Sequence, residues 1–495
     1  MAWDLETYRA DAERFTEELD REYYLHLAGH KAELDIEGIY ERYAGLFDRG
    51  AVERIGAARE AATGESERRL RYLHQFAFDG HLGAATRELE ARLAELEATL
   101  EIEVDDEAMP YRAGAIAQAN EAEADRRARI ESARHAVLTE SLNPVHREVL
   151  ERHHSIATEL GWPSYLDAYS DLRGLDLRAL SSRLDDFARR TEDDYARLVD
   201  PELELTVGRR LDEARRSDLP RLFRAAHLDD GFPPEDLVGS FRRTLAGLGI
   251  DLDSQENVLL DTVSRPSKSP RAFCATPRVP AEVHLVVPPI GGREDYSALF
   301  HEGGHAEHYG CTDGSLPFEY RHLGDNGVTE SFAFLLEGLT ADPGWLTEVL
   351  GSANPAQAVE HADAAKLIML RRYSAKIAYE VELHGPDADL GRMPERYAGL
   401  LGERIGVPWP GESWLADVDG GFYVACYLRA WALEVSWRRA LRERFGPRWF
   451  ANPEAGAWLR ELWSQGQRQS AEELLDAALG QSLDFGILTA ELIAV

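Results

Sequence analysis

The chain carries the sequence His301-Glu302-Gly303-Gly304-His305, which has the pattern H-E-x-x-H. This pattern lies in a segment, residues 296–309, that is predicted to be helical. Because positions four apart lie on one face of a helix, His301 and His305 can both reach one metal ion. Glu302 can then face a water molecule at the metal. Two neutral imidazoles and an oxygen ligand suit Zn²⁺, and a catalytic zinc keeps one coordination position open, so the sequence predicts one zinc ion per chain.

A carboxylate further along the chain is the candidate for the third ligand. The longer pattern H-E-x-x-H-x-x-G-x-x-H would supply a third His, but His308 stands at its glycine position and Cys311 at its last position. Glu330 follows in the largely apolar segment 328–337. A carboxylate among Phe and Leu side chains needs a partner, because burying it alone is costly. Glu330 is therefore predicted to be the third metal ligand.

Two further side chains are predicted to act around the metal. Glu337 lies seven residues after Glu330 on the same helix face, where it can orient an imidazole N–H. The alternative for Glu337 is an exposed charge on the helix surface. His308 lies three residues after His305, so it is a candidate to support a ligand or to contact a substrate, with a structural role as the alternative.

Two consecutive glycines inside the metal helix are locally unfavourable. Each costs about 1 kcal/mol relative to alanine in a helix interior. Gly303 and Gly304 therefore indicate that another backbone, or a substrate, comes close to this helix. A Gly304→Leu change is predicted to abolish activity by steric block.

Composition excludes several classes of protein. The chain has 495 residues, with 55 Lys and Arg against 89 Asp and Glu, a net charge of −34, so nucleic acid and anionic membranes are poor partners. Its three cysteines are far apart and form no disulfide framework or C-x-x-C site. The N-terminal segment lacks an apolar signal core, and no apolar run is long enough to span a bilayer. We therefore expect a cytoplasmic protein.

Hydrophobic periodicity predicts a mostly α fold. Apolar residues recur at spacings of three and four over residues 5–249. The composition changes at the polar loop 264–270, and the β-branched stretch 283–287 is predicted to be a strand beside the metal helix. Further helices are predicted at residues 328–339, 355–384, 421–445 and 451–479. We expect an N-terminal helical lobe at residues 1–260 and a catalytic zinc-binding lobe at residues 261–495.

These motifs resemble a known family. The pattern His301-Glu302-x-Gly304-His305-x-x-His308, followed by Glu330 and Glu337, is similar to that of the zinc oligopeptidases of the thimet oligopeptidase and oligoendopeptidase F family. The resemblance extends to residues 272–274 and to the 283–287 stretch, and more weakly to residues 160–165. It implies a two-lobed helical body with a deep substrate channel that cleaves short peptides. It also implies that the strand before the metal helix binds the substrate backbone in extended form.

The C-terminal part departs from the family pattern. That family carries a His followed by a Gly-Gly-Tyr stretch, whose tyrosines help to stabilise the oxyanion. Here Asp417 stands at the His position and Phe422 at that of the first Tyr. The candidate oxyanion donors are Tyr423, Tyr427 and Arg429. The same region, with the sequence at 379–383, also resembles the carboxypeptidase Taq family.

Four functions remain open on these residues. The favoured one is a zinc oligoendopeptidase in which Glu302 acts as general base. A second is a metallocarboxypeptidase, which needs a cation for the substrate carboxylate, with Arg371, Arg372 and Arg429 as candidates. A third is a peptide-binding protein that retains zinc but lacks turnover, and a fourth is a zinc hydrolase of a non-peptide amide. Mn²⁺ and Co²⁺ are alternative metals for this ligand set.

Overall fold

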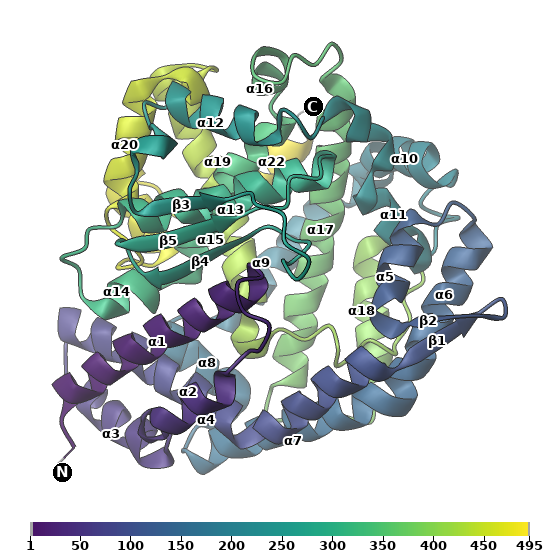
Figure 1. Ribbon diagram of the computed structural model, residues 1–495. Coiled ribbons are helices and arrows are strands. Elements are labelled where there is room, and N and C mark those ends of the chain that lie inside the picture. Colours follow the sequence, from purple (N-terminus) through teal and green to yellow (C-terminus); the bar gives the residue numbers. More distant parts are fainter. Residues whose placement is uncertain (1–2, 494–495) are drawn as a thin grey trace. The chain divides into compact units, whose positions relative to one another are not determined.

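The structure is a computed structural model, and it describes residues 3–493 (Figure 1). Helices account for 69% of the residues and strands for 5%, so the predicted mostly α fold is confirmed. The chain forms two compact units, each assembled from three segments. Within the described residues, unit 1 comprises 3–80, 228–359 and 429–487, and unit 2 comprises 81–227, 360–428 and 488–493.

This division differs from the single boundary near residue 260 that composition suggested. The boundaries between the units all fall within helices, namely α4 (Glu65–Thr99), the 3-10 helix η4 (Ala226–Gly231), α17 (Ala356–Leu383), α19 (Val424–Phe445) and α22 (Gly486–Ile493). The polar loop at 264–270 is not a linker, because it connects two strands inside unit 1. The change in composition at residues 264–270 therefore marks the passage from helices to strands. It does not mark a boundary between units, because the units are defined by which segments pack together.

Unit 1 holds the metal helix, α13 (Arg293–Cys311). Phe300 of α13 meets Phe241 and Trp345 edge to face, with ring centroids 5.2 and 5.1 Å apart, and all three rings are buried. This packing holds α13 against its neighbours α12 (Leu237–Gly247) and α16 (Pro343–Glu348). The other helices of unit 1, apart from parts of α4 and α19, are α1 (Leu5–Leu27), α2 (Ile36–Arg42), α3 (Arg49–Glu60), α12 (Leu237–Gly247), α14 (Phe318–His322), α15 (Asn326–Glu337), α16 (Pro343–Glu348), α20 (Pro453–Trp463) and α21 (Ala471–Leu479).

A three-stranded sheet lies beside α13 in unit 1 (Figure 1). Its strands are β3 (Val258–Asp261), β4 (Phe273–Arg278) and β5 (Glu282–Val286), in the order β3-β5-β4. β5 is the strand predicted at 283–287; it runs parallel to β3 and antiparallel to β4. Because β5 is paired on both sides, a peptide cannot add to it, which corrects the expectation that this strand binds substrate backbone. The edge strands of this sheet are β3 and β4.

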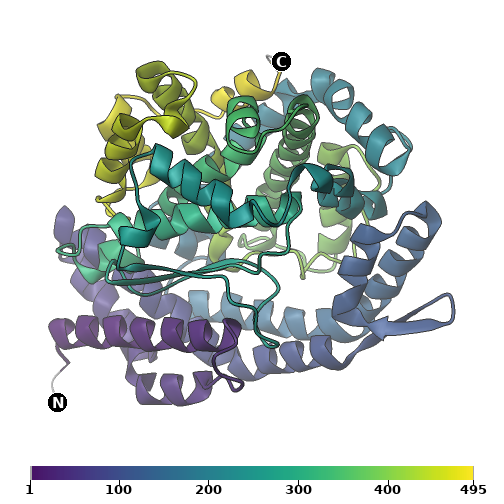
Figure 2. The same cartoon turned by 45° about the horizontal axis from the view of Figure 1, so that its top comes forward.

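Unit 2 is helical apart from one hairpin, β1 (Glu101–Val104) and β2 (Glu107–Pro110). Its tip projects past α5 and α6 in both views (Figure 1 and Figure 2). This hairpin was not predicted from the sequence; its turn residues Asp105 and Asp106 both have positive φ. The helices of unit 2, apart from parts of α4, α17, α19 and α22 (Gly486–Ile493), are α5 (Tyr111–Asn120), α6 (Ala124–Val137), α7 (Asn143–Glu159), α8 (Tyr165–Arg173), α9 (Leu177–Arg190), α10 (Glu192–Val207), α11 (Leu219–Arg224) and α18 (Met393–Ile405).

One predicted helix is in fact two. The segment 451–479 was expected to be continuous, but α20 ends at Trp463 and α21 begins at Ala471. Gly466 between them has φ 56°, a left-handed conformation that favours glycine. Ser470 and Glu473 then form a reciprocal capping box that starts α21.

Among the residues described, no helix combines the length and the apolar composition that crossing a membrane requires.

Candidate metal centre

The two glycines of the H-E-x-x-H stretch allow close packing against α13, Gly304 by the backbone of α15 and Gly303 by a side chain of α12. A Cβ atom on Gly304 would lie 2.6 Å from Cα of Ala333 and 2.6 Å from the carbonyl oxygen of Phe332, which are backbone atoms of α15. A Cβ atom on Gly303 would lie 2.4 Å from the ring of Phe241. For Gly304, the structure therefore supports the close approach of another backbone, one of the two explanations given above. This approach places the histidines of α13 opposite Glu330 of α15.

Three side chains predicted as metal ligands lie together in unit 1. We call His301, His305 and Glu330 the triad. One possible ligand atom from each lies within 4.8 Å of the others, and among the residues described this is the group of this kind that is found. Glu330 Oε2 lies 3.5 Å from His301 Nε2 and 3.7 Å from His305 Nε2. Tetrahedral zinc with ligand bonds of about 2.0–2.1 Å separates neighbouring ligand atoms by about 3.3 Å, so the triad has the spacing of a zinc site.

The other nitrogen of each imidazole is held by a neighbour. His301 Nδ1 lies 2.9 Å from Glu337 Oε2, and Ser297 Oγ donates to the second oxygen of Glu337 at 2.7 Å. His305 Nδ1 lies 2.8 Å from Thr329 Oγ1. When Nδ1 carries the proton and donates, Nε2 keeps its lone pair for a metal. With its one proton on Nδ1, each imidazole would therefore present the lone pair of Nε2 on the side of Glu330.

Thr329 was not identified from the sequence. It directly precedes Glu330, so its position next to a proposed ligand was the one signal available. A threonine in the first turn of a helix is usually interpreted as a capping or structural residue. Only the folded arrangement shows that its hydroxyl reaches His305 from the opposite helix.

Thr329 is expected to contribute to metal affinity by orienting His305. A Thr329→Val variant has nearly the same shape but loses the acceptor for His305 Nδ1–H. We expect it to bind zinc about 10–100-fold more weakly, as is typical for loss of a group that orients a ligand. Zinc titration of the metal-free protein measures this change. Thr329→Ser retains the hydroxyl and serves as the control; equal affinities for the wild type and Thr329→Val would contradict this role.

Glu302 lies beside the triad and is held by the edge of the sheet. The backbone N–H of Cys274 on β4 donates to Glu302 Oε2 at 2.9 Å. Burial raises the pKa of Glu302 to about 7, although the neighbouring His301 and the Cys274 N–H both act to lower it. A carboxylate with a pKa near neutrality is suited to accept and return a proton.

The two histidines of the triad differ in their electrostatic surroundings. Burial acts to lower the pKa of His301, but hydrogen bonds to Glu330 and Glu337 outweigh it and raise the pKa to about 10. Burial lowers the pKa of His305 to about 4, because Glu330 only partly opposes it. A metal ligand must be unprotonated, so metal binding at His301 displaces a proton and depends on pH.

His308 does not join the triad. Its side chain is buried, its ring contacts those of Phe332 and Tyr309, and its Nε2 lies 3.3 Å from the carbonyl oxygen of Gly466. Burial lowers the pKa of His308 to about 3. His308 is therefore a buried packing residue of α13. This is the structural role that was the alternative prediction for it.

Arg429 is bound by two carboxylates of unit 1. Its guanidinium donates to both oxygens of Asp325, at 3.0 and 2.6 Å, and also to Glu472. Asp325 is the N-cap of α15, where it accepts from the N–H of Gly327. The structure thus shows Arg429 supporting the start of the helix that carries Glu330, with its donors already engaged.

Tyr423 and Tyr427 belong to unit 2, and their role as oxyanion donors stays a prediction. Their ring centroids are 5.1 Å apart, and both side chains are partly exposed. Phe422, which precedes them, is buried and has a φ of 58°. Asp417, at the position of the family's His, accepts from Tyr397 at 2.7 Å and pairs with Arg372.

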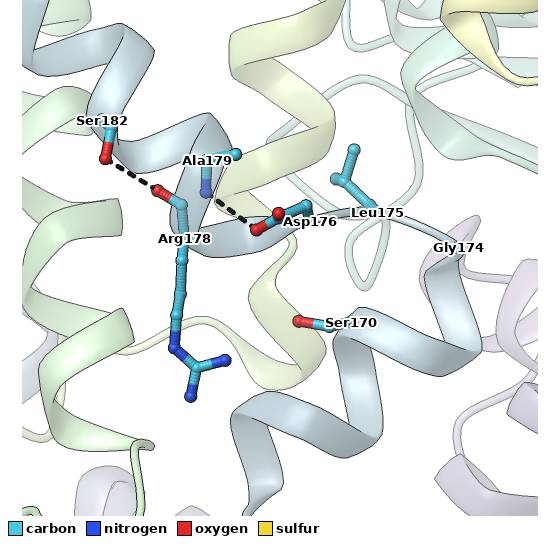
Figure 3. Close-up of a pocket in the computed structure, with 7 residues that line it drawn as sticks. All are labelled: Ser170, Gly174, Leu175, Asp176, Arg178, Ala179 and Ser182. Atoms are coloured by element: carbon cyan, nitrogen blue, oxygen red, sulfur yellow. Dashed lines mark hydrogen bonds between the residues drawn. The ribbon is translucent and has the colours of Figure 1, made fainter.

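A surface pocket of about 560 Å³ lies in unit 2, between α8 and α9 (Figure 3). The polar contacts drawn there belong to the helix itself: Asp176 accepts from the N–H of Ala179 at 2.8 Å, and Ser182 donates to the carbonyl of Arg178 at 3.1 Å. None of its lining residues is a predicted site residue. We therefore assign the chemistry to the triad and not to this pocket.

The chain was also compared with known proteins. No protein-family model matches it, and no curated protein matches it significantly.

Proposed function

We propose that this chain is a zinc-dependent peptidase that hydrolyses short peptides at internal bonds. One observation carries the proposal: the facing nitrogens of His301 and His305 and a carboxylate oxygen of Glu330 have the spacing of zinc ligands, with Glu302 beside them. The resemblance to the zinc oligopeptidases supports the same assignment. None of the three cysteines, all of which lie in the described part of the chain, forms a disulfide bond, which fits a cytoplasmic location.

The residues of the site fit a zinc ion and the hydrolysis of an amide. Zinc bound by the triad would polarise the scissile carbonyl and make the attacking water more acidic. Glu302 accepts the proton of that water and passes it to the leaving amine. Because the N–H of Cys274 binds one oxygen of Glu302, the carboxylate is held in one orientation. Glu337 and Thr329 keep the imidazoles turned towards the metal.

The edge of β4 is the proposed binding site for the peptide backbone. β4 is paired with β5 on one side only. The N–H of Cys274 donates to Glu302 rather than to β5, so it points away from the paired side. A peptide added along this edge would pass close to Glu302.

The metallocarboxypeptidase alternative receives less support. It requires a free cation for the C-terminal carboxylate of the substrate. Arg429 is bound by Asp325 and Glu472, and Arg372 is bound by Asp417. Arg371 is buried and donates to carbonyl oxygens, to Thr191 and to Glu192. All three candidate arginines are therefore engaged inside the fold.

Cleavage of a peptide mixture with blocked ends tests the proposal. Peptides of about ten residues, acetylated and amidated, are incubated with the zinc-loaded protein, with the same protein after chelation, and with chelated protein to which zinc is restored. We expect internal cleavage that chelation abolishes and zinc restores. Cleavage restricted to peptides with a free C-terminus would support a carboxypeptidase, and no cleavage of either set would contradict peptidase function.

A further inference from the structure

One acidic side chain of α1, that of Asp20, lies against the edge strand of the sheet in unit 1. Helix α1 packs along β4, and the two lie side by side in both views (Figure 1 and Figure 2). Tyr24 of α1 stacks on His284 of the central strand β5 at a centroid distance of 3.7 Å. One helical turn earlier, Asp20 Oδ2 accepts from the hydroxyl of Thr276 on β4 at 3.3 Å. From Tyr24 to Asp20, α1 therefore passes from the centre of the sheet to its edge strand.

Asp20 also acts on the residue that holds the proposed general base. Burial raises the pKa of the Cys274 thiol, and the charges of Glu302 and Asp20 raise it further. Burial likewise raises the pKa of Tyr309 on α13, and the charge of Asp20 contributes to that shift. Because Coulomb interactions weaken with distance, Asp20 lies close to the part of β4 that faces Glu302. A peptide bound along the edge of β4 would therefore pass near Asp20 as well as Glu302.

Asp20 lacks a cationic partner, in contrast to its neighbour on α1, Glu17. Glu17 forms ion pairs with Arg21 and Arg278. Within the described part of the chain, the hydroxyl of Thr276 is the one hydrogen-bond partner of the Asp20 carboxylate, and no Arg, Lys or His pairs with it. Burial raises the pKa of Asp20 to about 6, because the hydrogen bond from Thr276 only partly opposes it.

A structural role alone does not account for a carboxylate at this position. Burying a charge without a cation is unfavourable. The hydroxyl of Thr276 needs only an acceptor, and the carbonyl oxygen of an asparagine side chain would serve equally well. A charge that gives the fold no benefit is typical of a functional site, where stability is given up for binding. A cation brought by the substrate would supply the missing partner of Asp20.

We propose that Asp20 binds a cationic group of the peptide, either its N-terminal ammonium or a Lys or Arg side chain, while the peptide backbone lies along the edge of β4. The inference rests on the proposed peptidase function and adds a preference for cationic substrates to it. Charge-assisted hydrogen bonds to a carboxylate are stronger than neutral ones, and a partly buried carboxylate is screened less than an exposed one. The net charge of −34 attracts cations to the whole protein, whereas Asp20 fixes where along the peptide the charge lies.

Peptide pairs that differ by one charge test the inference. In a series of peptides with blocked ends, a single Lys occupies each position in turn, and each peptide has a partner with uncharged norleucine there. One further pair has a free or an acetylated N-terminus. In at least one pair, the wild type is expected to show a kcat/KM about tenfold or more in favour of the cationic peptide. The pair that responds identifies the source of the cation. Asp20→Asn should lose the preference, mainly through a higher KM for the cationic peptide, and Asp20→Glu should keep part of it.

Asp11→Asn provides the matched control for Asp20→Asn. Asp11 lies on the same helix and pairs with Arg14 on the surface, where an ion pair contributes little to stability. This change removes the same charge from α1 and should keep the full preference. At a pH above the pKa of Asp20, Asp20→Asn should not lower the melting temperature, because it removes an unpaired and partly buried charge. A clear loss of stability would show that Asp20 is a structural residue.

Separate readouts distinguish failure of this inference from failure of the peptidase function. Equal kcat/KM values within every pair, or a preference that survives in Asp20→Asn, would overturn the role of Asp20. An equal loss of preference in Asp11→Asn would assign the effect to the overall field of the protein and would also overturn it. If the wild type cleaves no peptide, the peptidase function fails. Calorimetric binding of the same pairs to zinc-loaded protein then decides on Asp20 alone: tighter binding of a cationic peptide by the wild type but not by Asp20→Asn supports the inference, and any other result overturns it.

Discussion

A Glu302→Gln variant is expected to bind zinc as the wild type does and to cleave peptides about 10²–10⁴-fold more slowly, the usual contribution of a general base. Glutamine has the same size and can accept the N–H of Cys274 through its carbonyl oxygen, so the site keeps its shape. It cannot take a proton from water. Initial rates on a fluorogenic peptide, measured with zinc content on the same samples, give both quantities.

Glu294→Gln provides a matched control for this substitution. Glu294 lies in the first turn of the same helix and is exposed. The control should change neither zinc content nor rate. Wild-type turnover by Glu302→Gln would show that another group takes the proton, and loss of zinc from this variant would show that Glu302 helps to hold the metal.

Replacement of Gly304 is expected to disrupt the site through the backbone. The Cβ atom of an alanine there would lie 2.6 Å from Cα of Ala333. Because neither atom can be moved by a side-chain rotation, α15 must shift. Overpacking of this kind costs about 1–3 kcal/mol for small additions. Gly304→Ala should therefore lower the melting temperature and weaken zinc binding, because Glu330 moves with α15. Gly304→Leu should prevent the site from forming and abolish activity.

A glycine in open space provides the comparison for Gly304. Gly83 lies within α4, and a Cβ atom added there would meet nothing within 4 Å. Gly83→Ala should leave zinc affinity unchanged and stabilise the protein slightly, by about 0.4–1 kcal/mol. Full zinc affinity and full activity in Gly304→Ala would contradict the view that close packing of α13 and α15 assembles the triad.

Local sequence patterns predicted the elements that carry the triad. The H-E-x-x-H stretch identified the face of α13, and the charged Glu330 in an apolar helix identified the partner from α15. The consecutive glycines indicated a close approach, which proved to be the backbone of α15. These features are readable because each depends on spacing within one helix or on the cost of burying one charge.

Features that depend on long-range packing were not predicted. Strand addition was predicted for β5, which has a neighbouring strand on both sides in the folded sheet. Thr329 was missed because its partner, His305, belongs to another helix. Arg429 was a candidate oxyanion donor, and its carboxylate partners, Asp325 and Glu472, were not recognised because they are distant in sequence. The short range of sequence patterns accounts for each of these differences.

Zinc titration of the metal-free protein, alongside Glu330→Ala, tests the central proposal most directly. Glu330→Ala removes the oxygen ligand and leaves both imidazoles in place. We expect the wild type to bind one zinc ion per chain and the variant to bind it more than about 100-fold more weakly, since even groups that only orient ligands contribute 10–100-fold. A wild-type chain without a saturable zinc site, or a Glu330→Ala chain of unchanged affinity, would contradict the proposal.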